Sequence, residues 1–531
     1  MNLEAFLRHL QYSPEKEQPP SFEVDWTDAP LPYKLYRGLP AIPLSLEVPL
    51  IMAGKAGPAG TEWRDLGHFL WYVYGLAQIT QSVTVPEGWP MQSLRRFLPS
   101  GGGLYPSELY VYVRGEELDN GSGIYHYDAA HHRLVLLRPG RFDSYLARVL
   151  GGRCDVSDCF ATVFVSTMFW KNYFKYSSFA YRLQGLDAGV AIGQLLEVAK
   201  RFGYEAGVHF QFLDRAVHHL LGLSEREESV YAVIPLSADP GKAWFPKGKA
   251  TEKGEAEASG AAAADLIQEL PKLEHRHYVR SRTIKEYPQL LAINEASWME
   301  TADAFRSALG VEDGEQADRA GELELPIGEK LSYDLAEICR KRVSPELDFT
   351  WGKVTLSELA ALLRETTTAF SYRNDLDRTP QNSGMRVSLY VCLHGVEGVA
   401  DGAYRYDAAL HALQPIRPGD QRLWLQQGMS MDNVNLFQVP LCFHVAGDRD
   451  FLLKELGYRG YRILQMEAGM LVQRLLLAAG AIGLGGHPLL GFDAISCDEL
   501  YQLEARGLTC LIQVPVGPYR YRPRLEGRLF G

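Results

Sequence analysis

The fold of this chain is encoded by a sixteen-residue stretch that occurs twice. Residues 125–140 read YHYDAAHHRLVLLRPG, and residues 404–419 read YRYDAALHALQPIRPG. Two tyrosines, an aspartate, a histidine and a closing Arg-Pro-Gly recur at the same places 279 positions later. So many matches in sixteen positions do not arise by chance, and a repeat of this kind indicates duplicated structural units.

The sequence around this stretch repeats as well, with nearly the same spacing. Three pairs of segments resemble each other: DLGHFLWYVYGLAQ (65–78) and SELAALLRETTTAF (357–370), SELYVYV (107–113) and VSLYVCL (387–393), and YRLQGLDAGVAIGQLLEVAKRFG (181–203) and YRILQMEAGMLVQRLLLAAGAIG (461–483). We therefore divide the chain into four parts: an N-terminal extension (1–39), a first copy (40–237), an inter-copy segment (238–324) and a second copy (325–531).

The inter-copy segment contains a stretch that is typical of a flexible linker. KGKATEKGEAEASGAAAAD (247–265) is rich in Gly, Ala, Lys and Glu and poor in bulky apolar residues, so we expect it to be mobile. Residues 266–324 contain helical patterns, and we expect them to pack on the outside of the two copies.

Each copy mixes strand and helix patterns. The alternation in SELYVYV predicts a strand that is buried on both faces. Apolar residues at helical spacing over 188–199 and 468–479 predict two core helices, which end at Gly203 and Gly483. The irregular alternation of strands and helices predicts an α+β fold rather than a doubly wound sheet. Two copies on one chain predict an intramolecular pseudo-dimer, in which a two-fold interface forms within one polypeptide.

Composition excludes several classes of protein. The chain has 531 residues and a formal net charge of −11, without a long Lys/Arg run, which argues against a nucleic-acid-binding protein. No apolar run predicts a membrane-spanning helix, and the N-terminus lacks the pattern of a secretory signal. Seven scattered cysteines without a CxxC pair predict reduced, buried thiols in a cytoplasmic protein, and no metal-ligand spacing is present.

The first copy carries a glycine-rich segment of a kind that can hold a cofactor. RRFLPSGGGLYPSELYVYV (95–113) places Pro99, Ser100 and three glycines directly before a strand. Glycines let the backbone approach a flat ring or an anion closely, and the serine hydroxyl both donates and accepts hydrogen bonds. An ordinary turn would carry the same residues, and the run does not fit the GxGxxG dinucleotide pattern.

The pattern RxxPSGGGLYPxELYxxV resembles the flavin-ring loop of nitroreductase-like flavoenzymes. Within them it is most similar to the SagB-type azoline dehydrogenases, which aromatise thiazolines and oxazolines in ribosomal peptide natural products. The segments YKLYRGLPAIPLS (33–45), YRLQGLDAG (181–189) and GLGGHPLLGFD (483–493) share this likeness, which covers both copies. The resemblance implies two tandem nitroreductase-like domains with FMN as the cofactor.

An FMN phosphate is bound by arginine or lysine side chains. The resemblance places the phosphate arginines in ICRKRVS (338–344), just before a helix start. The implied cofactor residues of the second copy are Arg340, Arg342, Ser344, Gly485, Gly486, Arg520 and Arg522.

The two copies differ in a complementary way. The first copy has no arginine cluster in its equivalent segments, 39–49 and 231–241. The second copy's counterpart of the glycine loop, TPQNSGMR (379–386), has lost the glycine triplet. In nitroreductase-like dimers one subunit grips the phosphate and the other lays its Pro-Ser loop on the ring. We therefore expect one FMN per chain, whose ring is covered from the first copy by Pro99, Ser100, Gly101 and Gly102.

The catalytic candidates are Lys175 and Tyr176 in FWKNYFKYSSFAYR (169–182), because azoline dehydrogenases of this family carry a Lys-Tyr pair there. Aromatising an azoline removes a Cα proton and passes a hydride from the neighbouring carbon to flavin N5, so a base must lie opposite the flavin. Lysine is a poor base at its ordinary pKa, and we expect burial among the aromatic residues of this segment to lower it. Tyr176 would relay the proton or steady the enolate.

Two further side chains are candidates for the pocket. Tyr105 lies in the glycine-rich segment, and His487 follows the glycine turn of the second copy. His132 and His411 recur in both copies, so we assign them to the shared fold.

The sequence favours an FMN-dependent azoline dehydrogenase that acts on a ribosomally made precursor peptide after a cyclodehydratase has formed the rings. Three alternatives remain open. They are a nicotinamide-dependent reductase of nitro compounds or quinones, an oxidase of a carrier-bound ring in non-ribosomal synthesis, and a flavin-free scaffold in a biosynthetic complex. The sequence leaves open the peptide, the preference between thiazoline and oxazoline, the electron acceptor and the oligomeric state.

Overall fold

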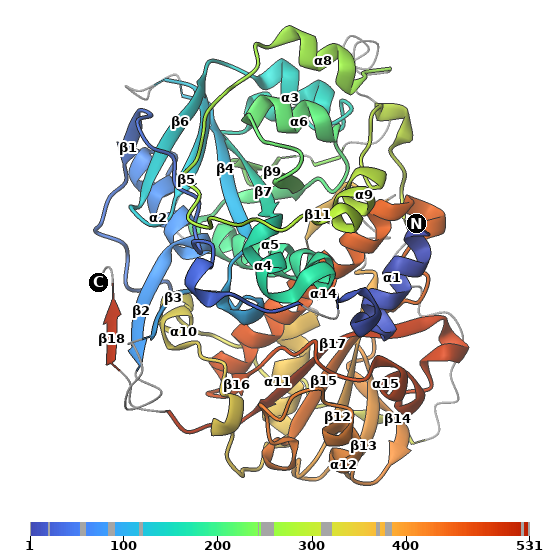
Figure 1. Cartoon of the computed structure of the whole chain (residues 1–531). Helices are drawn as coiled ribbons and strands as arrows, with labels where there is room; N and C mark the ends of the chain where they lie inside the picture. The colour runs from blue at the N-terminus through green and yellow to red at the C-terminus, as the bar shows by residue number, and fades with distance from the viewer. Residues whose placement is uncertain are drawn as a thin grey trace.

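We examined a computed structural model of the chain (Figure 1). It describes residues 2–19, 22–53, 60–82, 91–115, 121–242, 244–245, 260–308, 321–367, 372–377, 385–521 and 525–528. Most of the expected linker, most of the TPQNSGMR segment and Arg522 lie outside the described residues.

The first copy is built on an eight-stranded sheet with the order β1-β6-β5-β4-β7-β9-β8-β11. Its strands are β1 (Ala41–Pro43), β4 (Ser107–Val113), β5 (Gly123–Asp128), β6 (Arg133–Pro139), β7 (Ala161–Met168), β8 (Glu205–Val208), β9 (Glu228–Ser237) and β11 (Arg373–Asn374). Every residue of β4 is buried, which confirms the strand with two buried faces. Its helices are α2 (Trp63–Tyr74), α3 (Asp143–Val149), α4 (Phe169–Tyr176), α5 (Ala180–Phe202) and α6 (Asp214–Leu221).

The second copy repeats this plan with the order β10-β14-β13-β12-β15-β17-β16. Its strands are β10 (Leu323–Glu324), β12 (Val387–Leu393), β13 (Gly402–Asp407), β14 (Ala412–Pro418), β15 (Leu441–Asp448), β16 (Gly485–Gly486) and β17 (Leu508–Gly517). Its helices are α10 (Leu335–Lys341), α11 (Leu356–Thr367), α12 (Arg422–Gln427), α13 (Leu453–Leu456), α14 (Tyr458–Ala481) and α15 (Ala494–Leu500). The α+β class and the tandem arrangement are therefore confirmed.

The repeated sixteen-residue stretch forms a β-hairpin in each copy, β5–β6 and β13–β14. The histidine after each turn adopts a positive φ, 46° at His132 and 51° at His411. Each ring is held by the tyrosine five residues before it, through Tyr127 at 2.9 Å and Tyr406 at 2.8 Å. Both histidines thus serve the hairpin, as the repetition predicted.

The two copies meet along their longest helices, α5 and α14, which cross the centre of the molecule (Figure 1). The helices run in the same direction, because Tyr181 stacks on Tyr461 at 5.7 Å and, further along, Gln473 donates to Gln194 at 2.8 Å. At the crossing, a Cβ on Gly189 or Gly469 would overlap the backbone of the opposite helix. Glycine is required at these two positions because the main chains touch.

Three segments, β11, β18 and α1, pair with or pack against parts of the chain that lie far away in the sequence. β11 of the second copy adds a parallel strand to β8 of the first, and β18 (Leu525–Arg528) pairs with β2 (Leu76–Ser82), which also pairs with β3 (Met91–Arg96). Helix α1 (Leu3–Tyr12) of the N-terminal extension packs on the second copy, where Gln11 donates to Cys510 O at 2.8 Å.

The inter-copy segment contributes α8 (Ala263–Glu269), which packs on α3 and α6 of the first copy, and α9 (Pro288–Ala296), which packs against α14 of the second copy (Figure 1). All seven cysteines are buried free thiols. Among the described residues, no helix has the length and apolar character needed to cross a membrane.

The crossing of α5 and α14 is directly testable. Gly189→Val places three carbons against the Met466 backbone, so we expect overpacking of about 2–3 kcal/mol and a thermal midpoint lowered by about 2–3 °C for a chain of this length. Gly328→Val is the control, because a Cβ there meets nothing within 4 Å. Equal midpoints for the two variants, measured by circular dichroism, would contradict this packing.

Candidate active site

The glycine-rich segment of the first copy forms a tight turn on helix α5. Gly102 and Gly103 have φ of 64° and 68°, in the left-handed region that favours glycine. The buried carboxylate of Asp187 accepts a hydrogen bond from the Ser100 hydroxyl at 2.6 Å and another from the Gly101 N–H at 3.1 Å. The core helix therefore sets the conformation of the loop.

Lys175 and Tyr176 lie directly against this turn, at the C-terminal end of α4. A Cβ built on Gly102 would stand 2.5 Å from the Tyr176 hydroxyl and 2.9 Å from Lys175 Nζ. Only a residue without a side chain fits there. The structure thus brings together the predicted ring-covering loop and the predicted catalytic pair, although 73 positions separate Gly102 from Lys175 in the sequence.

The environment of Lys175 suits a proton acceptor. The side chain is half-buried, and burial lowers the pKa of its amine below the ordinary value. Its Nζ lies 5.4 Å from the ring centre of Trp26 and 4.9 Å from that of Tyr176. Burial also raises the pKa of Tyr176 to about 12, so its hydroxyl keeps its proton at neutral pH. Trp26 comes from the N-terminal extension and was not among the aromatic residues expected from the sequence.

Arginines from both copies meet beside the loop. Arg342 Nε of the second copy donates to Phe97 O at 3.1 Å, and Arg95 of the first copy donates to Arg342 O at 2.6 Å. Burial, with the neighbouring Arg95 charge, lowers the pKa of Arg342 to about 10. Within the described residues, no carboxylate pairs with Arg95, Arg340 or Arg342. Neighbouring arginines that no carboxylate neutralises are suited to binding an anion. Here they lie at the seam, by which we mean the place where the two copies meet beside the loop.

Arg342 also lines a cavity of about 440 Å³ in the second copy. Gly485 and Gly486 form the edge strand β16 on its wall, where a Cβ on Gly485 would stand 2.6 Å from Pro345. The other residues predicted to bind the FMN phosphate are placed differently. Arg340 lines a neighbouring small cavity with Arg95, and the Arg520 side chain is 72% exposed beside Asp348. Ser344 lines neither cavity.

The mirror-related position in the second copy is built from other residues. Glu467 stands on α14 where Asp187 stands on α5, 280 positions earlier. Its carboxylate accepts from the Arg386 N–H at 2.8 Å and pairs with the Arg386 guanidinium at 2.6 Å. Arg386 is buried and also pairs with Asp377 at 2.7 Å. A buried arginine thus pairs with Glu467 in the second copy, whereas in the first copy the corresponding Asp187 holds the Ser100-Gly101 turn.

Tyr105 and His487 lie near this seam with their polar atoms engaged. The Tyr105 ring is buried, its hydroxyl accepts from the Arg96 N–H at 3.1 Å, and its own N–H donates to Ser100 Oγ at 2.9 Å. His487 Nδ1 accepts from the Glu346 N–H at 3.2 Å. Burial, together with the Arg342 charge, lowers the pKa of His487 to about 4, so the ring is neutral.

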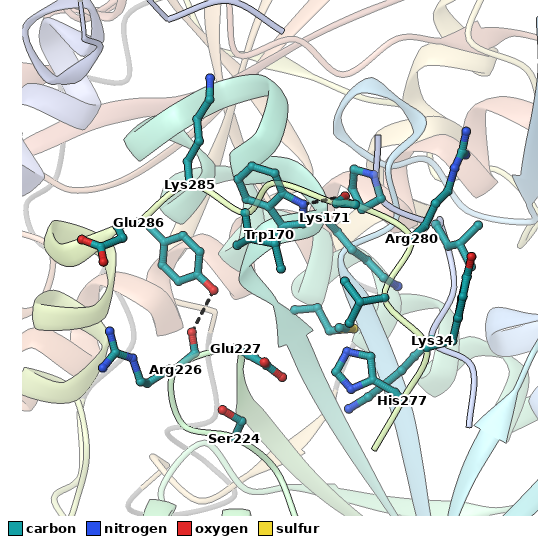
Figure 2. Close-up of a pocket in the computed structure, with 18 of the residues that line it drawn as sticks. Lys34, Trp170, Lys171, Ser224, Arg226, Glu227, His277, Arg280, Lys285 and Glu286 are labelled. Carbon is teal, nitrogen blue, oxygen red and sulfur yellow. Dashed lines mark hydrogen bonds between the residues drawn. The ribbon is translucent and has the colours of Figure 1, made fainter. Parts of the chain in front are cut away.

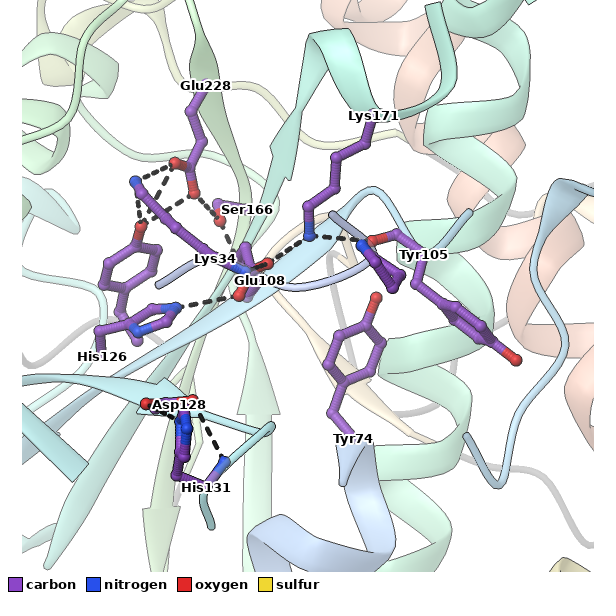
Figure 3. A network of polar contacts seen from close by, with 12 residues as sticks. Lys34, Tyr74, Tyr105, Glu108, His126, Asp128, His131, Ser166, Lys171 and Glu228 are labelled. Atoms are coloured by element: carbon purple, nitrogen blue, oxygen red, sulfur yellow. Dashed lines mark hydrogen bonds and ion pairs between the residues drawn. The ribbon is translucent and has the colours of Figure 1, made fainter. Parts of the chain in front are cut away.

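A further pocket of about 340 Å³ lies beside α4, against the inter-copy segment (Figure 2). Trp170 and Tyr287 form part of its wall, and Lys34 and Lys171 reach its inner end. Figure 3 shows that these two lysines belong to a buried ion-pair network. Lys34 pairs with Glu228 at 2.6 Å, and Lys171 pairs with Glu108 and donates to Tyr105 O at 3.1 Å.

Sequence reasoning missed three residues of the site: Trp26, Arg95 and Asp187. Arg95 was quoted within the glycine-rich motif but was not assigned a role. Asp187 was detectable as an acidic residue in the buried stripe of a repeated core helix, at a position where the other copy has Glu467. Trp26 carried no sequence signal, because its role depends on how the extension folds over α4.

Comparison with known proteins identifies the family. The Nitroreductase family profile matches residues 76–236 and 340–517, one region in each copy, so this chain belongs to the nitroreductase family. A crystal structure of a nitroreductase-like protein from Anabaena variabilis superposes with a TM-score of 0.74 at 24% identity, covering 98% of this chain and 99% of that one. That match shows that the fold of the whole chain, both copies included, occurs in another protein.

Several relatives of known name match parts of the sequence. The trifolitoxin-processing protein TfxB of Rhizobium leguminosarum is 30% identical over 150 residues, and the microcin B17-processing protein McbC of Escherichia coli is 29% identical over 139. The matches span 39% and 51% of those two proteins, and 27% and 25% of this chain. A protein of Methanocaldococcus jannaschii, named as a nitroreductase, is 22% identical over 196 residues, 37% of this chain and 92% of that protein.

The titration of Asp187 makes the stability of the protein depend on pH. Burial raises the pKa of Asp187 to about 7, whereas an unfolded aspartate titrates near 3.9. The folded state therefore holds the extra proton between these values, and the contribution of Asp187 to stability falls as the pH rises through this window. For such a difference the loss amounts to ~4 kcal/mol at most.

We expect the thermal midpoint of the wild type to fall relative to that of Asp187→Asn between pH 5 and pH 7.5, and the difference to level off above about pH 8. Thermal melts across this range measure it. Asp450→Asn, which removes an exposed partner of Arg8, is the control. Parallel pH profiles for the wild type and Asp187→Asn would be inconsistent with a protonated Asp187 in the folded state.

Proposed function

We propose that this protein is an FMN-dependent dehydrogenase that oxidises azoline rings, thiazoline or oxazoline, to azoles in a peptide natural product. One observation carries the proposal: Lys175 Nζ and the Tyr176 hydroxyl lie against Gly102 of the Pro-Ser-Gly loop. The likeness to two peptide-processing proteins, TfxB and McbC, supports a peptide substrate for this chain. We place the precursor peptide, and a cyclodehydratase complex that makes the azolines, among its partners.

The residues at the seam fit an FMN phosphate. Arg342 contributes Nη groups that have no hydrogen-bond partner among the described residues, and Arg95 adds a second guanidinium from the other copy. Gly485 and Gly486 leave the cavity beside Arg342 free of side chains on that wall. Ser100, Gly101 and Gly102 would cover the ring from the first copy. When bound, the flavin would accept the hydride that leaves the azoline carbon next to Cα.

The protein's own contribution to the chemistry is to accept and steer a proton. The neutral amine of Lys175 would take the Cα proton of the azoline, so that loss of a proton and a hydride leaves one new C=C bond in the ring. Tyr176, which keeps its proton at neutral pH, would donate a hydrogen bond to the enolate oxygen that develops next to Cα. Trp26 covers Lys175 and helps to exclude water from the amine.

Arg386 supports a single active site per chain. Its guanidinium pairs with Glu467 and Asp377, so the acid that corresponds to Asp187 already has an arginine as its partner. Ser177 and Gly457 cap α4 and α13 in similar backbone conformations, so the residues that correspond to Lys175-Tyr176 are Glu455-Leu456, and the Lys-Tyr pair is not repeated in the second copy. The alternatives from the sequence make different demands: a nicotinamide-dependent nitro or quinone reductase does not need Lys175, and a scaffold does not need the free arginines.

Replacing the proposed base tests the reaction. We expect Lys175→Ala to retain FMN but to oxidise azoline peptides at least about 100-fold more slowly, because general base catalysis contributes 10²–10⁴. The wild-type rate should rise with pH through the lowered pKa of Lys175, since only the neutral amine accepts a proton. Mass spectrometry follows the loss of two hydrogens per ring. Lys454→Ala, an exposed lysine in the second copy, is the control, and normal turnover by Lys175→Ala would exclude this base.

The cofactor site makes a separate prediction. We expect one FMN per chain, and at least about tenfold weaker FMN binding for Arg342→Ala, because a hydrogen bond to a charged group is worth about 1.5–3 kcal/mol. Arg520→Ala should have a smaller effect, because that side chain is 72% exposed. Flavin absorbance after unfolding gives the stoichiometry, and fluorescence titration gives the affinity. Two flavins per chain, or unchanged binding by Arg342→Ala, would refute the composite site.

A further inference from the structure

The pocket beside α4 is a formed cavity that the proposed reaction does not use. Its volume of about 340 Å³ lies in the range of small-molecule sites, and its walls come from four separate parts of the chain. These parts are residues 30–34 of the N-terminal extension, residues 168–171 at the start of α4, the turn at 224–227 and residues 277–291 of the inter-copy segment. Two of the four lie outside the repeated copies.

The two lysines at the inner end of the pocket are each paired with a carboxylate, while the lining also includes the charged residues Arg226, Glu227, Arg280, Lys285 and Glu286. The ammonium of Lys34 is paired with Glu228, and that of Lys171 is paired with Glu108 (Figure 3). His277, which faces the same end in Figure 2, is neutral at pH 7, because burial and the Lys34 charge lower its pKa to about 4. Apolar and aromatic side chains, including Met168, Trp170 and Tyr287, line much of the remainder. This combination favours an uncharged apolar or aromatic side chain.

Four exposed apolar side chains, which we call the apolar strip, lie at the pocket or beside Lys175: Tyr278, Val279 and Ile284 line the pocket, and the Trp26 ring lies 5.4 Å from Lys175 Nζ. The exposures of Trp26, Tyr278, Val279 and Ile284 are 54%, 40%, 45% and 46%. The extension and the inter-copy segment are joined along this strip, because the carboxylate of Asp28 accepts from the N–H groups of Arg282 and Thr283 at 2.7 and 2.8 Å. Large apolar side chains gathered on one face usually mark a binding surface.

Ring contacts measure how close the pocket lies to the proposed base. The Trp170 ring in the pocket wall lies 6.2 Å from Phe174, Phe174 lies 5.3 Å from Trp26, and Trp26 lies 5.4 Å from Lys175 Nζ. The sum of these steps is an upper limit on the separation, and an extended peptide advances ~3.3 Å per residue, so at most roughly five residues span it. A peptide with one residue at Lys175 therefore reaches the pocket with a residue a short distance along its chain.

The pocket is held in shape before any ligand binds. Trp170 Nε1 donates to Ser281 Oγ at 2.9 Å, and the Tyr287 hydroxyl donates to Arg226 O at 2.8 Å (Figure 2). These bonds tie the inter-copy segment to α4 and to the turn before β9. A preformed pocket spares the ligand the cost of ordering the protein on binding.

We propose that this pocket binds a large apolar or aromatic side chain of the peptide substrate, within about five residues of the azoline that lies at Lys175, while the strip holds the residues between. This inference rests on the proposed function, since it takes the occupant to be that same peptide. It adds a specificity site made by the N-terminal extension and the inter-copy segment, in place of recognition by the reacting ring alone.

The test compares two synthetic peptide series. Each peptide contains one thiazoline and either a phenylalanine or a glycine, placed at one of the positions from about two to about six residues before or after the ring. For the wild type we expect one phenylalanine position to lower KM about tenfold relative to glycine, with kcat unchanged, because burial of an aromatic side chain is worth about that much. Equal KM values at every position would overturn the proposal.

Filling the pocket should abolish this preference. Ser224 lies at the pocket and is exposed, so Ser224→Trp adds an indole there, and Ser144→Trp, on the exposed face of α3, is the matched control. We expect Ser224→Trp to lose the tenfold advantage of phenylalanine and Ser144→Trp to keep it. If Ser224→Trp folds poorly, Ile284→Asp replaces it, with Ile327→Asp, at a position 82% exposed, as the control. A preference that survives in both pocket variants would overturn the site.

Direct binding separates this inference from the proposed reaction. Fluorescein-labelled peptides that carry the finished thiazole bind without turnover. The ratio of Kd between the glycine and phenylalanine peptides then reports the contribution of the pocket. Phenylalanine-dependent binding that is lost in Ser224→Trp supports the pocket even if the wild type oxidises no thiazoline, an outcome that would defeat the proposed function only. Turnover of thiazolines with no phenylalanine-dependent binding would defeat the pocket and leave the proposed function standing.

Discussion

The contact between the backbones of α5 and α14 determines how the two copies are placed, and the site depends on that placement. Gly189 and Gly469 have no side chain, so the helices approach until main-chain atoms touch, and Tyr181 and Tyr461 stack beside the crossing. This geometry carries the segment before the Pro-Ser-Gly loop of one copy to Arg342 of the other, where Phe97 O accepts from the guanidinium. A wider spacing of the helices would separate the two halves of the site.

The same pair of helices also explains why the copies are not equivalent. Asp187 and Glu467 occupy matching positions, yet the shorter acid accepts from a serine-glycine turn and the longer acid is paired with a buried arginine. Breaking a buried pair such as Arg386–Glu467 leaves an uncompensated charge, which is costly. In the second copy Glu467 therefore keeps Arg386 as its partner. In the first copy Asp187 holds a turn that lies against Lys175 and Tyr176.

The parts of the chain outside the repeat complete the surroundings of the site. The N-terminal extension supplies Trp26 over Lys175, and the inter-copy segment supplies Ser281 and Tyr287 beside α4. Our two proposals thus separate chemistry from recognition: the duplicated copies would hold the cofactor and the base, and the added segments shape the surface next to them. A duplicated enzyme can acquire a new specificity in this way without changing its core.

Features that depend on local spacing and residue type could be predicted from the amino-acid sequence. These are the two copies, the repeated hairpins with His132 and His411, the core helices, the glycine turn and the Lys-Tyr pair, since each is written within a short stretch. Which distant residues meet became clear only from the folded chain. It placed Arg95 beside Arg342, turned Arg520 toward solvent, set Asp187 under the loop and folded Trp26 over Lys175. Such contacts join residues tens to hundreds of positions apart, and helix packing, which leaves no periodic trace at those positions, brings them together.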